Sequence, residues 1–385
     1  SALINEGTIA ADAGQTVTLA GSGLTNTGTI QANGGTVYLA GTYRTPQLGT
    51  LRNSGGVIYL SGALDNAGAT LSLNAATGVL SLAGGTITGG TVSAEAGGGL
   101  AVAGSGVLSA VTLNTDLTVS DRSTLTVRDG LTLADGHRVV LNSTIWGAGL
   151  SFAGASQTLG GDGEVVFGGT YPNSVLRAGL DAGQTLTIGA GITVHGSTGG
   201  QGGTVDAASA LINEGTIAAD AVGQSVTITG SSVTNAGRIV AAAGTIRASS
   251  PGFRNDGIFA VLSGTTATAS SIANFGTIDI QDGGLFNVTG SFTNDSSGFV
   301  QTSIAGSVPS ALGRISISGE TSLDGTIKLR LVDGYVPPLG QTLQVITYGS
   351  RLGSFAALSD LDPADGVTYE VVYNAADLTV LVVPG

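Results

Sequence analysis

Short runs of alternating apolar and polar residues recur along the chain. Four of them are Thr16–Leu19, Thr36–Leu39, Val57–Leu60 and Val79–Leu82. Every second residue in these runs is apolar, which is the period of a β-strand with one buried face. The leucines that end them are 20, 21 and 22 residues apart. This spacing predicts one inward position that repeats on successive coils of about 20 residues.

A second repeated motif is a large apolar residue, any residue, Asn, any residue and Gly, as in Leu3–Gly7. Its Asn residues are Asn5, Asn26, Asn53, Asn66, Asn213, Asn235, Asn255, Asn274 and Asn294, and the last copy has Ser296 in place of Gly. Because Asn tolerates left-handed backbone angles and its side chain bonds neighbouring backbone, we expect these residues to stack as a structural ladder at one corner. A ligand-binding array with one Asn per coil is the alternative.

Both patterns predict an all-β fold, a right-handed parallel β-helix (β-solenoid) over residues 1–312. Gly and β-branched residues dominate and no helical stripe persists, so helix is not expected as a major component. Residues 1–12 return unchanged as residues 209–220, which indicates block duplication. Since residue 1 lies within a repeat, we expect a mature form or a segment of a longer protein. Between about residues 85 and 205 the Asn motif lapses, so corners there should be built differently.

The pattern changes at about residue 313. The strand-like runs that follow are longer and lose the 20-residue spacing, as in Gly325–Leu331 and Leu378–Val383. An open solenoid end would expose unpaired backbone and apolar core. Residues 313–385 are therefore predicted to form a small antiparallel β cap module.

Composition narrows the possible functions. The chain of 385 residues has 26 acidic and 13 basic residues, a net charge of -13, and a single lysine, Lys328. Isolated cations do not bind phosphate backbones well, so nucleic-acid and anionic-membrane binding are set aside. The chain has no Cys, which excludes thiolate catalysis and thiolate metal sites. No apolar run is long enough for a membrane-spanning helix.

The repeats resemble the haemagglutinin-type repeats of large bacterial exoproteins of the filamentous haemagglutinin kind, and the passenger β-helices of autotransporter adhesins. The residues that carry the resemblance are the Leu-x-Asn-x-Gly-x-Ile units, such as Leu24 to Ile30, and the segment Gln157 to Phe167. The end of the chain, from Leu323 to Phe355, looks like the terminal β module of many such surface proteins. The resemblance implies secretion to the bacterial cell surface and a role in adhesion, aggregation or biofilm.

Candidate chemistry is sparse. The densest charged stretch contains Asp121, Arg122, Arg128, Asp129 and Asp135. Asp162 and Glu164 are the nearest approach to the carboxylate pair of a polysaccharide-cleaving β-helix. His137 and His195 lie 58 positions apart and are interpreted as turn residues rather than metal ligands. Trp146, Tyr38 and Tyr59 could contact sugar, although packing is the simpler explanation. No catalytic, cofactor or metal site is expected.

Three functional hypotheses follow. The leading one is a non-enzymatic extracellular β-solenoid, a stalk or filament segment whose partners are cell-surface or matrix polysaccharide or protein, or copies of itself stacked end to end. The alternative is a polysaccharide-binding or polysaccharide-cleaving β-helix. Ice binding is a third, suggested by Thr-x-Thr units such as Thr16/Thr18, but Tyr38, Tyr59 and Ser81 interrupt the column.

Overall fold

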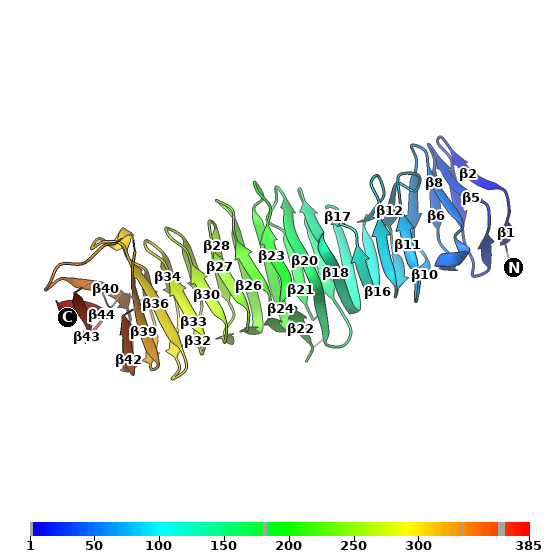
Figure 1. The fold of residues 1–385 in the computed structure, drawn as a ribbon. Coiled ribbons are helices and arrows are strands. Elements are labelled where there is room, and N and C mark those ends of the chain that lie inside the picture. Colours follow the sequence, from blue (N-terminus) through cyan, green and yellow to red (C-terminus); the bar gives the residue numbers. More distant parts are fainter. Residues whose placement is uncertain (1–2, 180–182, 333, 361–365) are drawn as a thin grey trace. The chain divides into compact units, whose positions relative to one another are not determined.

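The computed structural model describes residues 3–179, 183–332, 334–360 and 366–385. Strands make up 63% of it and helices 2%, and the chain forms a parallel β-solenoid of about 14 turns with about 22 residues per turn. The predicted all-β parallel solenoid is therefore confirmed. The turns are longer than the expected 20 residues because several coils carry extra residues at their corners. The chain divides into two compact units, residues 1–200 and 201–385. Within each unit the strands stack coil on coil (Figure 1).

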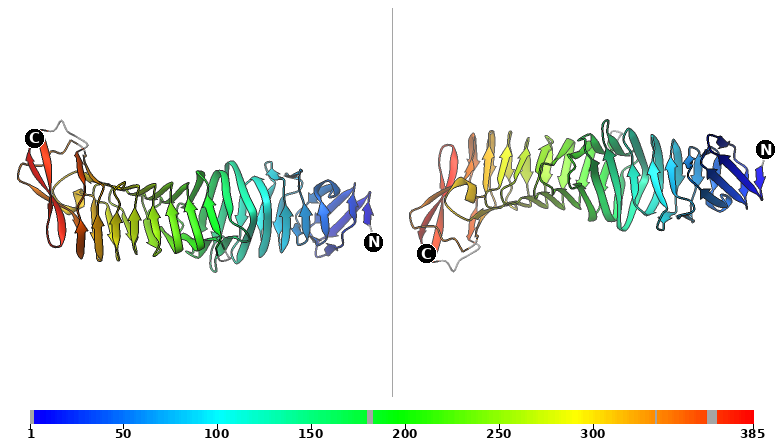
Figure 2. Two further views of the ribbon diagram at one scale, coloured as in Figure 1. Left: turned by 90° about the horizontal axis from the view of Figure 1, so that it is seen from below. Right: turned by 90° about the horizontal axis from the view of Figure 1, so that it is seen from above.

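The strands of the first unit lie on three faces, on which most strands of successive coils pair in parallel (Figure 2). Pairing is interrupted between Leu24–Asn26 and Thr42–Arg44 on the first face, and between Thr50–Asn53 and Thr70–Leu73 on the second. The first face contains β1 (Leu3–Asn5), β4 (Leu24–Asn26), β7 (Thr42–Arg44), β10 (Ala63–Asp65), β13 (Gly85–Thr88), β16 (Ser105–Asn114), β18 (Ser123–Ser143), β19 (Ala148–Phe152) and β21 (Ser174–Ala178). The second contains β2 (Thr8–Asp12), β5 (Thr29–Asn33), β8 (Thr50–Asn53), β11 (Thr70–Leu73), β14 (Thr91–Ala94), β20 (Gln157–Gly169) and β22 (Thr185–Ile188). The third contains β3 (Thr16–Leu19), β6 (Thr36–Leu39), β9 (Val57–Leu60), β12 (Val79–Leu82), β15 (Gly99–Val102), β17 (Leu117–Val119) and β23 (Gly191–Gly196). The long strands β16, β18 and β20 bend round corners and so join more than one face.

The core is a set of apolar columns that run through the coils. Leu19, Leu39, Leu60 and Leu82 pair in register, and all four are buried. The inward column predicted from their spacing is thus confirmed. Stacking of equivalent apolar residues on adjacent coils is how a solenoid buries apolar surface without a larger central core.

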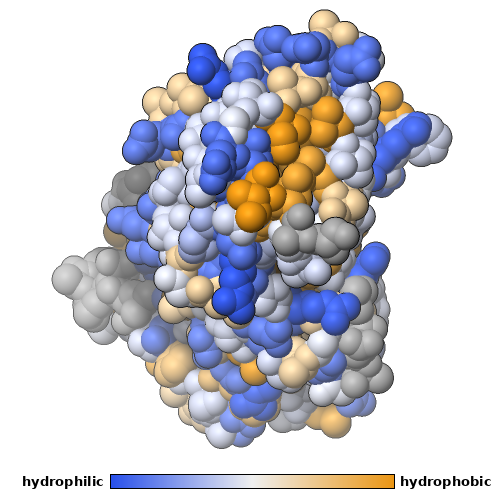
Figure 3. All heavy atoms as spheres, turned by 90° about the vertical axis from the view of Figure 1, so that its right-hand side faces the viewer, coloured by the Kyte–Doolittle hydropathy of each residue, from blue (hydrophilic) through white to orange (hydrophobic). Residues whose placement is uncertain are grey.

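The N-terminal coil has a neighbouring coil on one side only. Leu3 is 44% exposed and Ile4 68% exposed, whereas Leu211, the equivalent of Leu3 in the second copy of the duplicated sequence, is 1% exposed. Figure 3 looks onto this end of the first unit and shows apolar side chains gathered among polar ones. The same residues therefore bury or expose their apolar side chains according to their position in the stack.

The second unit has the same plan. Its first ladder contains β24 (Gly202–Asn213), β26 (Ser225–Asn235), β28 (Thr245–Ser249), β31 (Thr266–Ala269), β34 (Leu285–Val288), β37 (Arg314–Ile317) and β40 (Thr342–Thr347). The second continues from the ends of β24 and β26 to β29 (Phe253–Asn255), β32 (Ile272–Asn274), β35 (Phe292–Asn294), β38 (Glu320–Leu323) and β41 (Ser350–Gly353). The third contains β25 (Thr216–Ala219), β27 (Arg238–Ala241), β30 (Ile258–Val261), β33 (Thr277–Ile280), β36 (Phe299–Ile304), β39 (Thr326–Leu331) and β42 (Ala357–Asp360).

Among the described residues, antiparallel pairing between strands occurs at the C-terminus, and two isolated antiparallel bridges, Asp12 with Gly34 and Ile304 with Leu312, lie elsewhere. At the C-terminus, β44 (Asp377–Pro384) pairs with both β40 and β43 (Val367–Tyr373). Parallel pairing continues through β42, so the boundary expected at residue 313 does not coincide with a change in pairing. The 20-residue spacing disappears because Leu285 pairs with Arg314 and Ile315 with Ile346, separations of 29 and 31 residues. The first of these coils contains the short 3-10 helix η2 (Pro309–Ala311).

The predicted Asn ladder is continuous in the second unit. The Nδ2 group of each Asn donates to Oδ1 of the next, at 2.8, 2.7, 2.7 and 2.6 Å, through Asn213, Asn235, Asn255, Asn274 and Asn294. All five side chains are buried. Their Nδ2 groups also donate to backbone carbonyls, as Asn255 does to Gly257 and Thr277. Each rung thus closes a corner and joins it to the next coil.

The ladder is interrupted in the first unit. Asn5 donates to Asn26 at 2.7 Å, but Asn26 then donates to the carbonyl of Leu48 at 2.6 Å. The next coil carries the 3-10 helix η1 (Thr45–Gln47) at this corner, and the Thr45 hydroxyl donates to Oδ1 of Asn66 at 2.7 Å. A hydroxyl and a carbonyl therefore stand in for the missing Asn.

Asn53 is not part of the ladder, which corrects the sequence-based assignment. It lies on the second face, in register with Ala32, and its Oδ1 accepts from the backbone of Gly56 at 2.9 Å. The extra residues of the η1 corner lengthen this coil. The Leu51–Asn53 motif consequently arrives one face later than the other copies.

The ladder predicts a large difference between two Asn substitutions. Asn255→Ala leaves the buried amide groups of Asn235 and Asn274 without their partner, and should lower the local free energy of unfolding by about 1 to 3 kcal/mol. Asn53→Ala, the matched control, should change it by less than about 0.5 kcal/mol. Hydrogen exchange measures the difference, at the amides of β26, β29 and β32 for Asn255→Ala and at those of β5, β8 and β9 for Asn53→Ala. Equal effects of the two substitutions would show that the ladder is not a stabilising element.

Candidate functional site

After Asn66, one corner of the first unit is built without Asn. In-register pairing places Asp65, Thr88, Ser109 and Arg128 above one another at the end of the first face. The residue that follows each of them turns the corner. It is Asn66 in the first of these coils and then Gly89, Ala110 and Asp129. The lapse of the motif noted in the sequence is therefore a change in how this corner is made.

The backbone at this corner is in an unusual conformation. Ala110 and Asp129 have φ angles of 54° and 56°, and Arg122 at 59° is the third non-glycine residue with positive φ in the described ranges. A side chain makes this left-handed region unfavourable, more so for Ala than for Asp. Strand pairing shifts register at the same point, between Ser109 and Val111. Strained residues that persist in a folded protein cluster at functional sites, so this corner is a candidate site.

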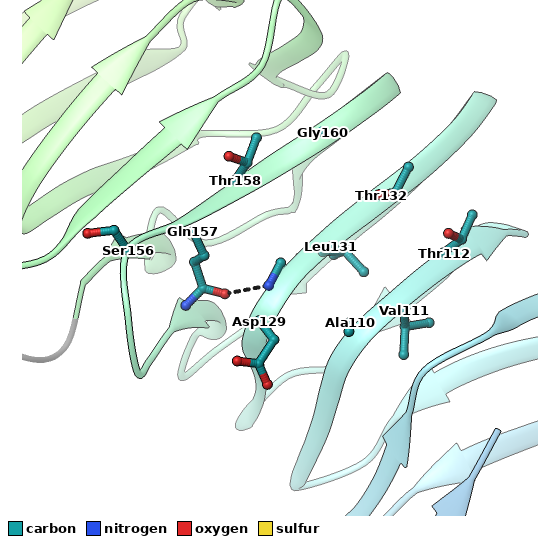
Figure 4. Close-up of a pocket in the computed structure, with 11 residues that line it drawn as sticks. Ala110, Val111, Thr112, Asp129, Leu131, Thr132, Ser156, Gln157, Thr158 and Gly160 are labelled. Atoms are coloured by element: carbon teal, nitrogen blue, oxygen red, sulfur yellow. Dashed lines mark hydrogen bonds between the residues drawn. The ribbon is translucent and has the colours of Figure 1, made fainter. Parts of the chain in front are cut away.

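The corner opens into a groove, here called the corner groove, of about 490 Å³. It crosses β16, β18 and the start of β20 (Figure 4). Its lining residues are Ala110, Val111, Thr112, Asp129, Gly130, Leu131, Thr132, Ser156, Gln157, Thr158 and Gly160. The volume falls within the range of about 300 to 1,000 Å³ that small-molecule sites occupy.

Polar groups of the corner groove are held in place by neighbouring coils. The Ser109 hydroxyl donates to Oδ2 of Asp129 at 2.7 Å. Oε1 of Gln157 accepts from the backbone N–H of Gly130 at 3.0 Å, and its Nε2 donates to the carbonyl of Ala153 at 3.1 Å. Figure 4 shows the Gln157 side chain reaching the backbone beside Asp129. The carboxylate of Asp129 and the amide of Gln157 are thus each held by hydrogen bonds to other residues of the corner.

Three threonines and a glycine form the outer wall of the corner groove. Thr112 and Thr132 are in register, and Thr132 is in register with Gly160 on the next coil. Thr158 precedes Gly160 by two residues on the same strand. A Cβ added to Gly160 would meet only the Thr158 methyl group, at 3.7 Å. The groove is therefore hollow at Gly160 because that residue lacks a side chain.

A second structured feature surrounds Asp121. Its Oδ1 accepts hydrogen bonds from the backbone N–H groups of residues 144–147 on the next coil, at 2.9 to 3.2 Å. These bonds, the one from Ile145 foremost, hold the pKa of Asp121 well below its ordinary value of 3.8. The Arg122 guanidinium lies over the Trp146 ring at 4.3 Å, and Trp146 is 61% exposed. Asp121 thus anchors a loop that presents the only tryptophan of the chain.

The two histidines are not brought together. Nδ1 of His137 lies 3.3 Å from Oδ1 of Asp116. The other carboxylate oxygen of Asp116, Oδ2, lies 3.1 Å from Nε of Arg138. Nε2 of His195 lies 3.7 Å from Oε2 of Glu164. Within the described ranges, no group of three His, Cys, Asp or Glu residues could hold a metal ion. Asp116 is not among the candidates that the sequence suggested, although its 21-residue separation from His137 is about one coil length.

The other candidate residues are dispersed. Asp121 bonds the loop at residues 144–147, Asp129 lines the corner groove, and Arg128 and Asp135 are exposed. Asp162 and Glu164 lie two residues apart on β20, and Glu164 faces His195 rather than a second carboxylate. The charged stretch from Asp121 to Asp135 is therefore several separate contacts and not one site.

The two tyrosines stack on each other. The rings of Tyr38 and Tyr59 lie in register on the third face, with centroids 5.1 Å apart and planes inclined by 22°. Each ring covers a face of the other, as expected for coil-to-coil packing. Trp146 is the more accessible aromatic side chain.

Comparison with known proteins finds no family model and no curated protein that matches this chain. Across the described residues, no helix combines the length and the apolar character needed to cross a bilayer. The functional assignment therefore depends on the geometry of the coils and corners.

The Asp121 anchor predicts an acid transition. Because its pKa is lowered in the folded chain, its stabilising contribution is complete above the unfolded value and is lost as pH falls through the folded value. Trp146 fluorescence, from the single tryptophan, should report loop release with a midpoint below pH 3.8. Asp121→Ala should show the released signal already at neutral pH, while Asp135→Asn should titrate as the wild type does. A wild-type midpoint at or above the ordinary aspartate value would contradict the proposed anchor.

Proposed function

We propose that this chain is a non-enzymatic structural and adhesive β-solenoid of the bacterial cell surface or extracellular matrix, a stalk or filament segment. The main observation behind the proposal is that many polar side chains of the chain form hydrogen bonds between neighbouring coils. Asn213 to Asn294 bond one coil to the next, and Asp121 and Asp116 bond groups on the following coil. Side chains committed to coil-to-coil bonds serve assembly rather than turnover.

The solenoid itself supports this role. Each coil needs only its neighbours, so duplication of a block such as residues 1–12 and 209–220 lengthens the protein without a new core. Repeated coils also present long faces on which a partner can make many weak contacts at once. Both properties suit a protein that spans distance and holds surfaces together.

Extracellular location and adhesion follow from the resemblance to haemagglutinin-type repeats. The absence of Cys and the acidic, nearly lysine-free composition agree with a secreted protein stabilised by repetition. The proposed partners are cell-surface or matrix polysaccharide or protein, and further copies of the chain.

Polysaccharide cleavage remains the competing activity. It requires two carboxylates placed about the scissile bond, or a carboxylate with a metal. Asp162 and Glu164 are the pair that the sequence suggested; Glu164 lies beside His195, and no group of three residues that could hold a metal ion occurs among the described residues. The adhesive role is therefore preferred.

Two assays on the purified chain test the proposal together. Beads coated with the folded chain should bind bacterial cells or extracted matrix more strongly than beads coated with heat-unfolded chain. The chain should release no reducing ends or unsaturated products from a panel of polysaccharides. Asp162→Asn and Glu164→Gln should leave bead adhesion unchanged. Turnover that either substitution abolishes would overturn the proposal in favour of an enzyme.

A further inference from the structure

We propose that the corner groove is a binding site for a neutral sugar unit of a polysaccharide. The inference deepens the proposed adhesive function, on which it rests, by naming the class of ligand and the residues that hold it. Asp129, Gln157 and the threonines that line the groove are the binding groups.

The chemistry of the lining selects the ligand. A carboxylate accepts hydrogen bonds, threonine hydroxyls donate and accept them, and the Gln157 amide retains a second N–H after its bond to Ala153. The hydroxyl groups of a sugar ring both donate and accept, so they match this mixed set. Charge-assisted bonds to Asp129 are the strongest of these contacts.

The negative charge of the corner groove disfavours acidic sugars as ligands. None of the described residues that line the corner groove is basic, and Asp129 supplies a negative charge. The chain as a whole carries a net charge of -13. Sulfated or uronic-acid sugars would therefore meet like charge with no cation to neutralise it. An apolar ligand would leave the carboxylate, amide and hydroxyls without partners.

The backbone positions these groups at a cost in strain. Left-handed angles at Ala110 and Asp129, together with the shifted pairing at Ser109, break the corner that Asn66 closes elsewhere. The Asp129 side chain is then fixed by Ser109 on one side, while Gln157 is fixed by Gly130 and Ala153. A preformed polar set of this kind loses little conformational freedom on binding.

Two matched glycines allow a clean test. Gly160 lines the corner groove and Gly99 lies on β15 outside it. Both have ordinary backbone angles, and an added Cβ at either would meet a single atom at 3.7 Å. Isoleucine at either position should fold well because it favours strands. Only Gly160→Ile places its side chain in the groove.

The experiment is a printed glycan array followed by calorimetric titration. The array carries neutral gluco-, galacto-, manno- and N-acetylhexosamine oligomers beside sulfated and uronic ones. The wild-type chain should bind at least one neutral series and no acidic one. Gly160→Ile and Asp129→Asn should each weaken that binding at least tenfold, while Gly99→Ile should leave it unchanged. Thermal unfolding midpoints of the three variants should match the wild type.

Two outcomes would overturn the inference. One is the absence of binding to every neutral series, and the other is binding that Gly160→Ile leaves unchanged in a folded protein. Bead adhesion measured on the same variants separates the two proposals. If adhesion persists without glycan binding, the proposed sugar site is refuted while the proposed adhesive function is retained.

Discussion

Parallel pairing in register is the constraint on which this structure depends. It places each residue above the equivalent residue of the next coil, so a side chain must pack well against its own kind. Leucine satisfies this requirement in the core by apolar contact. Asn satisfies it at the corner because its amide donates from one side and accepts on the other. The leucine column from Leu19 to Leu82 and the Asn column from Asn213 to Asn294 both meet the requirement that identical side chains on successive coils pack against each other.

The same constraint explains where the surface can vary. A residue inside a column is tied to its neighbours above and below, whereas a corner can lengthen or change conformation without disturbing the faces. The η1 corner replaces an Asn with a hydroxyl and a carbonyl, and the corner at Ala110 and Asp129 replaces it with left-handed backbone. Corners are therefore the places at which a repeated scaffold can gain a binding site.

The sequence predicted the columns well because their signal is a simple period. Strand alternation and Asn spacing required no knowledge of distant contacts, and both appear in the structure as paired rungs. The prediction that Asn53 belongs to the ladder was wrong, because a local motif cannot reveal that an upstream insertion has moved the motif to another face of the solenoid. Antiparallel strands lie at the C-terminus as expected, but the lengthened coils after residue 313 concealed a parallel ladder that continues to β42. The corner groove and the Asp121 anchor could not be predicted from the sequence, because both depend on positive φ angles and on pairing between coils.

Side-chain amide exchange measured by NMR tests the central claim most directly. If the Asn ladder joins the coils, the Nδ2 protons of Asn213, Asn235, Asn255 and Asn274 should exchange far more slowly than those of Asn53. Their buried, hydrogen-bonded positions require local opening before exchange, whereas the Asn53 side chain is partly exposed. Rapid exchange at all five positions would contradict the account, because it would mean that the amides are not bonded between coils in solution.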